Sequence, residues 1–282
     1  MSGSPAGRSR IASALRAEGA PAVAIALAST LAVAVAVIWV VLHSPNWPRV
    51  RSAFFDPAEF ARSFPDIART FLRNIRYFLI AEAVILIWAL VLAVVRSLPG
   101  PVFFPLRALA IAYTDLFRGI PTILVVYLLG FGVPSLGIPG VPTSPAFWAV
   151  TGLVLSYSAY VAEVYRAGIE SVHPSQVAAA RSLGLSRFQG LRYVVVPQAV
   201  RRVVPPLLND FVGLQKDTAL VAFVVAIPEA FKQAQIYQSA DFNFTPLLGA
   251  AVMFLLVTVP LTRTVDWMLG RERRRRQAGS AL

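Results

Sequence analysis

Long uncharged stretches alternate with short charged segments along this chain of 282 residues. Residues 21–42 carry no charge, and at about 1.5 Å per residue one helix of this length can cross the core of a bilayer. Because the apolar core of a signal peptide is only about 7–15 residues long, this length favours a retained span. Further apolar stretches cover residues 77–95, 119–142, 144–162 and 246–262. The pattern predicts an all-α integral membrane protein.

The segment between the first two stretches, residues 43–76, has a helical period of its own. Arginine and aspartate side chains alternate there with apolar ones, which recur at steps of three and four residues: Phe60, Phe64, Ile67, Phe71 and Ile75. This is the pattern of an amphipathic helix that lies on the membrane surface or on the protein itself. We place this segment outside the cytoplasm.

Residues 203–228 are the ambiguous part of the pattern, because polar side chains interrupt the apolar ones. Hydropathy alone would miss a span here. With five spans and the N-terminus inside, the tail at residues 271–282, which carries five arginines, would face outward, against the positive-inside tendency. We therefore predict six transmembrane helices, with residues 1–20 and 271–282 both in the cytoplasm.

Composition and charge agree with this arrangement. The chain is 57% apolar and 14% charged and has no cysteine, which argues against a water-soluble enzyme. Its net charge of +12 would suggest a nucleic-acid partner in a soluble protein. In the six-span arrangement, however, 18 of the 26 basic residues fall on the cytoplasmic side, where arginine sets orientation. We expect the arginine tail to contact anionic lipid and expect no nucleic-acid partner.

The loop at residues 168–197 predicts two short helices joined by an elbow. Pro174 fixes φ for a first helical turn, and Gly184 can adopt the left-handed conformation that ends a helix. Ser186 and Gln189 have the spacing of a capping box, which begins the second helix. Pro197 then begins the next span. A short, rigid helix with small side chains suits docking into a groove of another protein.

The same loop resembles the hallmark of the permease subunits of ATP-binding-cassette (ABC) importers. That hallmark reads EAA, three residues, G, nine residues, I, one residue, LP. Ala179, Ala180 and Gly184 match in register, Val194 stands at the isoleucine position, and Val196 and Pro197 stand at the LP pair. Ala178 replaces the usual glutamate.

Other segments are similar to the polar-amino-acid branch of that family. Phe117–Pro121 resembles the FRGTP segment, and Tyr160–Ile169 resembles the AYxAExxRGGI segment. Residues 182–186, 197–199, 205–206 and 216–218 match other recurrent segments. The resemblance covers residues 70–270.

This resemblance implies a type I importer fold, in which a five-helix core follows one N-terminal helix and carries a cytoplasmic coupling-helix loop. It implies a permease for a polar amino acid or similar small zwitterion in a bacterial cytoplasmic membrane. Its partners would be a pair of ATPase subunits, a second permease and an extracytoplasmic solute-binding protein. The residues implied in ATPase coupling are Ser175, Gln176, Ala179, Ala180, Arg181, Ser182, Gly184, Leu185 and Ser186.

Polar side chains within spans are costly in lipid, so each normally faces a partner or a wet cavity. Asp210 and Asp217 are two helical turns apart and share a face, and Asn209 and Lys216 share the adjacent one. We predict that this face lines a translocation path; the alternative is that these groups pair with each other and brace the bundle. The complete candidate set is Glu82, Asn209, Asp210, Gln215, Lys216 and Asp217.

A second set of residues carries a structural or gating role in our interpretation. Glu163 and Arg166 have the i, i+3 spacing of an ion pair on one helix, and this pairing is favoured over a gating role. The set consists of Arg118, Pro121, Glu163, Arg166, Gly168 and Pro197.

Several kinds of active site are missing from the sequence. There is no phosphate-binding loop, since glycine precedes neither lysine, and ATP hydrolysis must occur in another chain. His43 and His173 lack the neighbouring ligands that a metal site needs. We predict no catalytic residues, no metal and no cofactor in this chain, which disfavours a membrane enzyme. The remaining alternative is a secondary transporter or channel driven by an ion gradient.

Overall fold

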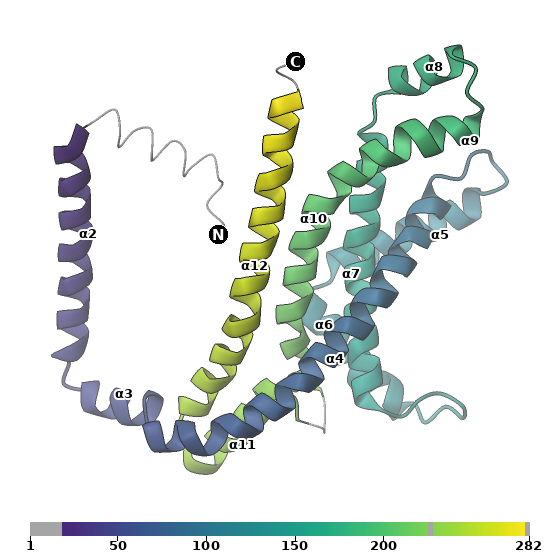
Figure 1. Ribbon diagram of the computed structural model, residues 1–282. Coiled ribbons are helices and arrows are strands. Elements are labelled where there is room, and N and C mark those ends of the chain that lie inside the picture. The colour runs from purple at the N-terminus through teal and green to yellow at the C-terminus, as the bar shows by residue number, and fades with distance from the viewer. Residues whose placement is uncertain (1–18, 225–227, 280–282) are drawn as a thin grey trace. The chain divides into compact units, whose positions relative to one another are not determined.

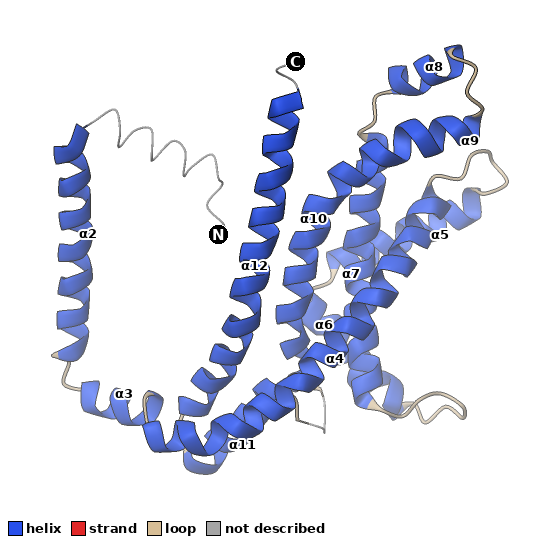
Figure 2. Cartoon of the chain, in the orientation of Figure 1, coloured by secondary structure: helices blue, strands red, loops and turns tan. Residues whose placement is uncertain are grey.

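The computed structural model describes residues 19–224 and 228–279, and these are almost entirely helical. Figure 2 shows helices and loops and no strand in the described part of the chain. The chain divides into two compact units, residues 1–56 and residues 57–282. Most of the segment that we predict to be the cytoplasmic N-terminus, residues 1–18, lies outside the described residues.

The first unit contains α2 (Gly19–Leu42) and α3 (Trp47–Phe54). Helix α2 coincides with the first predicted span and carries no charge. Near its end, the rings of Trp39 and His43 stack with their centroids 4.5 Å apart, and His43 Nδ1 lies 2.8 Å from the carbonyl oxygen of Trp39. His43 therefore closes the end of a helix, and it lies in no group of metal-binding side chains among the described residues.

The second unit begins with α4 (Pro57–Arg96), which joins the predicted amphipathic segment and the predicted second span in one 40-residue helix. Pro65 lies inside this helix. Ile67 and Phe71 are buried against α11 and α12, so the amphipathic part packs on the protein itself. Of the two surfaces predicted for its apolar face, the membrane and the protein itself, the structure shows the protein.

The third predicted span differs from the structure. Helix α5 (Phe104–Gly119) ends where the predicted span begins, and α6 (Thr122–Ser135) follows after a bend of 103°. The break falls at Ile120, which is extended with ψ of 131° because the ring of Pro121 disfavours helical backbone in the preceding residue. The bend thus falls at the start of the predicted stretch, α6 lies within it, and α5 and α6 together form a bent pair that could cross a membrane as one span.

The core of the second unit surrounds α7 (Pro145–Glu170), which packs against α4, α5, α6 and α10. Gly152 of α7 allows the closest approach, since a Cβ there would lie 2.9 Å from the Cα of Val126 in α6. Ile85, Leu153 and Leu214 are fully buried members of the same cluster. The core therefore lies where α7 meets these four helices, and it fixes the position of α7.

The predicted coupling loop folds as its sequence indicates. Helix α8 (Pro174–Ser182) starts at Pro174, and Gly184 follows it with φ of +81°. Helix α9 (Arg187–Gly190) starts with a capping box in which Ser186 N donates to Gln189 Oε1 over 2.8 Å and Gln189 N donates to Ser186 Oγ over 3.2 Å. Both turn predictions are confirmed.

A short π-helix, η1 (Leu191–Val195), joins α9 to α10 (Val196–Asp217). Pro197 lies in the first turn of α10, as predicted. Helix α10 contains the polar residues that made this region ambiguous in the sequence. In Figure 1 it runs from the loop of α8 and α9 toward the opposite end of the unit.

Beyond α10 the chain forms a 3-10 segment, η2 (Thr218–Phe223), then α11 (Ala230–Asp241) and α12 (Thr245–Gly279). The hydropathy pattern did not predict α11, which is too polar to resemble a span. Helix α12 contains the fifth apolar stretch and continues into the arginine tail as far as Gly279. The side chains beyond Arg271 lie outside the described residues.

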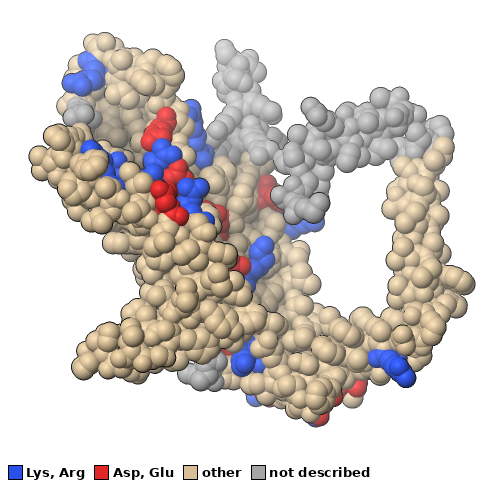
Figure 3. Space-filling model, turned by 180° about the vertical axis from the view of Figure 1, so that it is seen from behind, with Lys and Arg blue, Asp and Glu red and all other residues tan. Residues whose placement is uncertain are grey.

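By length and composition, four described helices could cross a membrane: Ala24–Leu42, the helix within Trp47–Arg96, Pro145–Glu170 and Thr245–Arg271. The bent pair α5 and α6 could form a fifth. Helix α10 is absent from this group because of its polar residues, so the sixth span stays a prediction. In Figure 3 charged groups gather in small clusters, and most of the visible described surface carries none, as a lipid-facing surface requires.

Candidate functional site

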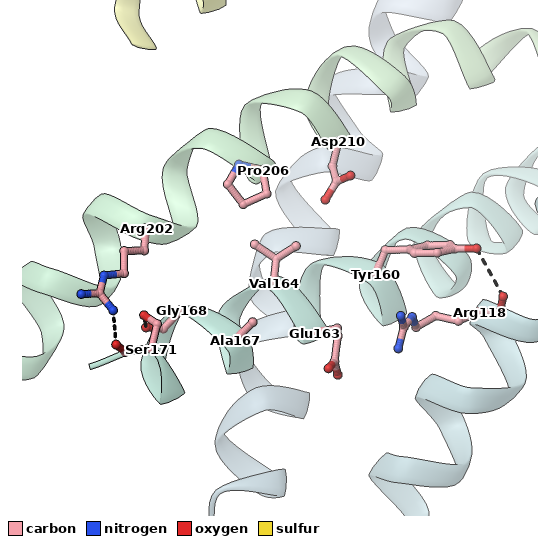
Figure 4. Close-up of a pocket in the computed structure, with 10 residues that line it drawn as sticks. All are labelled: Arg118, Tyr160, Glu163, Val164, Ala167, Gly168, Ser171, Arg202, Pro206 and Asp210. Carbon is pink, nitrogen blue, oxygen red and sulfur yellow. Dashed lines mark hydrogen bonds between the residues drawn. The ribbon is translucent and has the colours of Figure 1, made fainter. Parts of the chain in front are cut away.

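A pocket of about 490 Å³ lies between α7 and α10, beside the end of α5. Its charged and aromatic lining residues are Arg118, Tyr160, Glu163, Arg202 and Asp210. Figure 4 shows that they come from all three helices. The pocket therefore brings groups of both charges together inside a largely apolar unit.

Asp210 lies at one end of this pocket on α10. Its side chain points away from its helix toward α7, where Val164 and Tyr160 lie (Figure 4). The carboxylate is half-buried, and it lies within electrostatic range of Glu82 on α4. Two of the predicted path residues, from helices far apart in the sequence, are thus neighbours in the structure.

Arg118 and Tyr160 form a second part of the lining. The guanidinium of Arg118 lies 5.9 Å from the centroid of the Tyr160 ring, within the range of a cation–π interaction. The Tyr160 hydroxyl donates to the carbonyl oxygen of Arg118 over 3.3 Å (Figure 4). These contacts hold the last turn of α5 against α7, next to the break at Pro121.

Glu163 is held by arginines from two helices. Arg96, at the end of α4, donates to it over 2.9 Å, and Arg166 Nε donates to it over 3.1 Å. Arg96 also donates to Thr114 of α5 over 3.2 Å, and Arg166 pairs with Glu170. The predicted pair of Glu163 and Arg166 is present, and it belongs to a network that joins three helices.

The predicted residues of α10 separate into two groups. Gln215 is 1% exposed and accepts a hydrogen bond from Thr258 over 2.6 Å, and Asp217 accepts one from Tyr157 over 2.8 Å. These partners belong to α12 and α7, whereas the alternative interpretation expects the polar groups to pair with each other. Asn209 and Lys216 are instead exposed on the surface of this single chain, where lipid would be a poor environment for them.

Gly168 and Arg202 join α7 to the first half of α10. A Cβ at Gly168 would overlap the side chain of Val203 and lie 3.4 Å from the carbonyl oxygen of Ala199. Arg202 donates to the carbonyl oxygen of Ser171 (Figure 4). A side chain at position 168 would therefore require Val203 or the helices to shift.

The predicted coupling residues lie mostly on an open surface. Among them Ala180 is buried, at 4% exposure, Leu185 is half-buried, and the others are exposed. His173 caps α8, since its Nδ1 accepts from Ser175 N over 3.2 Å. Leu183, between the two helices, is 83% exposed. The loop thus presents small, polar and apolar groups that no other described residue covers.

Sequence reasoning missed several residues that shape the site. Arg96, Tyr157 and Arg202 each tie together helices that are distant in the chain, and no local pattern identifies such pairs. Asn74 had a detectable signal, because it is a polar residue on the apolar stripe of α4 that contains Ile67 and Phe71. Its partner is Glu229, which no local pattern in the sequence identifies.

Comparison with known proteins places this geometry in context. The sequence profile of the family described as "Binding-protein-dependent transport system inner membrane component" matches residues 102–275. The probable amino-acid permease protein YxeN of Bacillus subtilis is 35% identical over 176 residues, which cover 62% of this chain and 76% of YxeN. The probable glutamine ABC transporter permease protein GlnP of the same organism is 37% identical over 179 residues, covering 62% and 79%.

Solved structures agree with the sequence comparisons. A crystal structure of an amino acid ABC transporter with histidines matches with a TM-score of 0.68 and 28% identity, covering 77% of this chain and 98% of the matched chain. The MetNI methionine ABC transporter in an inward-facing conformation matches with a TM-score of 0.56 and 16% identity, covering 72% and 94%. This second likeness concerns the fold alone.

Proposed function

Since the chain belongs to the family of binding-protein-dependent transport system inner membrane components, the permease subunits of ABC importers, we propose that its amino acid substrate crosses the membrane along α10. Its relatives are amino acid permeases, and family membership favours ATP-driven import over transport driven by an ion gradient. The chain is a transport subunit and not an enzyme, and the ATPase is a separate subunit.

The pocket between α7 and α10 is the observation that carries this proposal. An amino acid presents a carboxylate and an ammonium group, which need partners of opposite charge when they leave water. Arg118 and Asp210 supply one group of each sign in the same pocket. Glu163 is less available, because two arginines already bind its carboxylate. The candidate path therefore consists of Asp210, Glu82, Asn209 and Lys216, with Arg118 beside Asp210 in the pocket and with Gln215 and Asp217 as supports.

The exposure of Asn209 and Lys216 supports a second permease as partner. Both lie on one face of α10 and have no cover in a single chain. A second permease, identical or related, would enclose this face in a polar path instead of leaving it in lipid. An extracytoplasmic solute-binding protein would deliver the amino acid at the end opposite α8, and anionic lipid would surround the arginine tail.

Helix α8 is our candidate for the site at which the ATPase docks. Its exposed residues and its rigid turns suit a groove on a partner, and Arg202 and Gly168 link the neighbouring parts of α7 and α10. Docking here would place α8 and both termini in the cytoplasm in a six-span arrangement. Arg118, Pro121, Glu163, Arg166, Gly168 and Pro197 would hold the cytoplasmic ends of the helices in register.

Substitutions on α10 test the path. In proteoliposomes that contain the complete transporter, Asn209→Ala and Asp210→Asn should lower ATP-driven uptake of labelled amino acids or change the preference among them. The control is Asp115→Asn, which makes the same chemical change as Asp210→Asn at an exposed position on α5. Unchanged uptake, preference and coupling in both α10 variants would refute this assignment.

Cysteine cross-linking tests the docking site, and the natural chain contains no cysteine that could interfere. Ser182→Cys, at the exposed end of α8, should cross-link to an ATPase subunit in the assembled transporter. Ser239→Cys is the matched control, since it is also exposed but lies on α11 at the other end of the unit (Figure 1). Persistent failure of Ser182→Cys to cross-link in a transport-competent complex would count against docking at α8.

A further inference from the structure

Helix α4 turns a row of arginines away from the rest of its unit. Ile67 and Phe71 mark the buried side of the helix. At about 100° per residue, Arg69, Arg73 and Arg76 lie on the opposite side, and all three are exposed. In the six-span arrangement this row lies outside the cytoplasm, where arginine is disfavoured by the positive-inside tendency. The row is therefore an exception to the charge distribution of the chain.

Arg73 and Arg76 form the end of this row that is nearest to the apolar part of α4. Both guanidinium groups lie within electrostatic range of the Tyr77 hydroxyl. Arg73 donates to the carbonyl oxygen of Pro228, and no described residue forms a hydrogen bond or an ion pair with Arg76. The nearby carboxylate of Glu229 is buried and already accepts hydrogen bonds from α4 and α11. The two arginines thus keep N–H donors for an external anion.

An apolar groove of about 380 Å³ lies farther along α4, between this helix and α7. Around the helix axis, Val84 and Ile87 of the groove fall within about 80° of Arg73 and Arg76, so both features share one face. The residues that line the groove are Val84, Ile87, Trp88, Val154 and Leu155.

The spacing between the arginines and the groove corresponds to one leaflet of a bilayer. At about 1.5 Å per residue, Val84 and Trp88 lie about 12 Å and 18 Å beyond Arg76, and half of a hydrocarbon core is about 15 Å thick. Helix α7 begins at Pro145, and Val154 lies about 14 Å from that end. Both helices therefore place the groove near the middle of the membrane and Arg76 near its surface.

We propose that Arg73, Arg76 and the groove beside Trp88 form a binding site for an anionic phospholipid. The guanidinium groups donate to the lipid phosphate, whose oxygens suit their geometry, and one acyl chain lies between α4 and α7. An anionic headgroup fits better than a zwitterionic one, because it brings no positive charge toward the two arginines. The site rests on the proposed function only for its place in the outer leaflet, since that function puts α8 in the cytoplasm.

The surface between the two features favours a lipid over a protein partner. Leu79 and Ile80, which follow Arg76, are 58% and 52% exposed, as a lipid-facing surface requires. An acidic soluble protein would meet the arginines but would not reach a groove at this depth. A transmembrane helix would fill the groove but would leave the arginines without an anion. A phospholipid supplies the anion and the apolar chain in one molecule.

Two photoactivatable lipids test the site in the reconstituted transporter. Both carry the reactive group in the middle of the same acyl chain, and they differ only in their headgroup. Phosphatidylglycerol should label residues 84–88 and 154–155 several-fold more strongly than phosphatidylcholine. Equal labelling would overturn the proposal, because the groove would then be an ordinary lipid-facing surface. This comparison uses the natural chain, so misfolding of a variant cannot affect it.

Substitutions of the arginines test the headgroup contact. Arg73→Gln together with Arg76→Gln should lower labelling by phosphatidylglycerol to the level of phosphatidylcholine. Arg69→Gln is the matched control in the same exposed row, because Arg69 pairs with Asp66 and lies about 27 Å from Ile87 along the helix. Unchanged labelling of the double variant, or an equal loss in the control, would contradict the assigned headgroup site.

A larger side chain in the groove tests the position of the acyl chain. Val84→Phe narrows the groove and should lower labelling by phosphatidylglycerol several-fold. Leu79→Phe should not, because Leu79 is exposed on the same helix but lies outside the groove. Equal labelling of the two variants would show that the chain lies elsewhere. A cross-link from Ile87→Cys to a second permease, in place of lipid labelling, would make the groove a protein interface.

Loading the lipid into one leaflet separates this site from the proposed function. Photoactivatable phosphatidylglycerol that is exchanged into the leaflet opposite the ATPase should label the groove. Labelling from the ATPase leaflet alone would support the lipid site but would contradict the proposed placement of α8. Labelling from neither leaflet would overturn the lipid site and leave the proposed transport function untouched.

Discussion

Arg96 at the end of α4 donates a 2.9 Å hydrogen bond to Glu163 in α7, although the two residues are 67 positions apart. Both side chains are largely shielded, at 15% and 23% exposure. In this setting an unpaired charge is costly, and removing one partner costs more than the pair itself contributes. The contact therefore fixes the end of α4 beside the pocket, although Arg166 binds the same carboxylate from within α7.

Arg96→Ala should consequently destabilise the folded permease, by about 1–3 kcal/mol, and should lower its thermal unfolding temperature in detergent. Arg69→Ala is the control, because the Arg69 side chain is 81% exposed and its nearest distance to Asp66 is a long 3.5 Å. Its loss should therefore cost less than about 1 kcal/mol. Equal effects of the two substitutions would show that the pair of Arg96 and Glu163 does not stabilise the fold.

The close approach of α7 and α10 predicts a severe effect of a single methyl group. Gly168→Ala places a Cβ in the space of the Val203 side chain, and overpacking of this kind costs about 1–3 kcal/mol. We expect lower ATP-driven uptake and a lower unfolding temperature. Gly132→Ala should be neutral, since nothing lies within 4 Å of its added Cβ.

A second substitution can restore the space that Gly168→Ala removes. Val203→Ala removes the methyl group that would overlap the new Cβ, so the double variant Gly168→Ala with Val203→Ala should recover part of the lost uptake. Failure to recover, with both single variants folded, would show that the effect at Gly168 does not arise from this contact.

The parts of the fold that follow from local sequence were predictable. Pro174, Gly184 and the pair of Ser186 and Gln189 act on backbone within three residues of themselves, so α8, its end and the start of α9 followed from spacing. The break between α5 and α6 had an equally local signal in Pro121. The long uncharged stretch concealed this signal, because hydropathy carries no information on the direction in which a helix runs.

Contacts between distant helices were not predictable from one sequence. The sequence placed Asp210 and Asp217 on one face correctly, yet it could not show that Tyr157 binds Asp217 and leaves Asp210 in the pocket. The partners of Glu163 illustrate the same limit, since Arg166 is one helical turn away whereas Arg96 comes from another helix. Hydrophobic periodicity specifies faces, and only the packed structure specifies which faces meet.

The left-handed turn after α8 provides a test that is confined to the coupling loop. Gly184 has φ of +81° and open space around it, so a substitution there acts through the backbone alone. Gly184→Val should cost about 1–2 kcal/mol locally and weaken co-purification of the ATPase, whereas Gly184→Asn should cost less, because asparagine tolerates this conformation better. Equal binding of the ATPase by both variants would show that the turn does not position α8.

Burial of Glu229 predicts a dependence of stability on pH. Burial raises the pKa of its carboxyl group above the ordinary value of 4.5, although Asn74, two backbone N–H groups and the charge of Lys232 act in the opposite direction. A carboxyl group whose pKa is raised by folding contributes stability below its ordinary pKa and loses it as the pH rises through the folded pKa. Glu229→Gln keeps the group neutral, so wild type should lose stability relative to this variant as the pH rises from below 4.5 through the raised pKa of Glu229, as measured by thermal unfolding in detergent. Asp115→Asn, at an exposed position, should show no such trend, and a relative gain of wild type with rising pH would contradict the buried environment of Glu229.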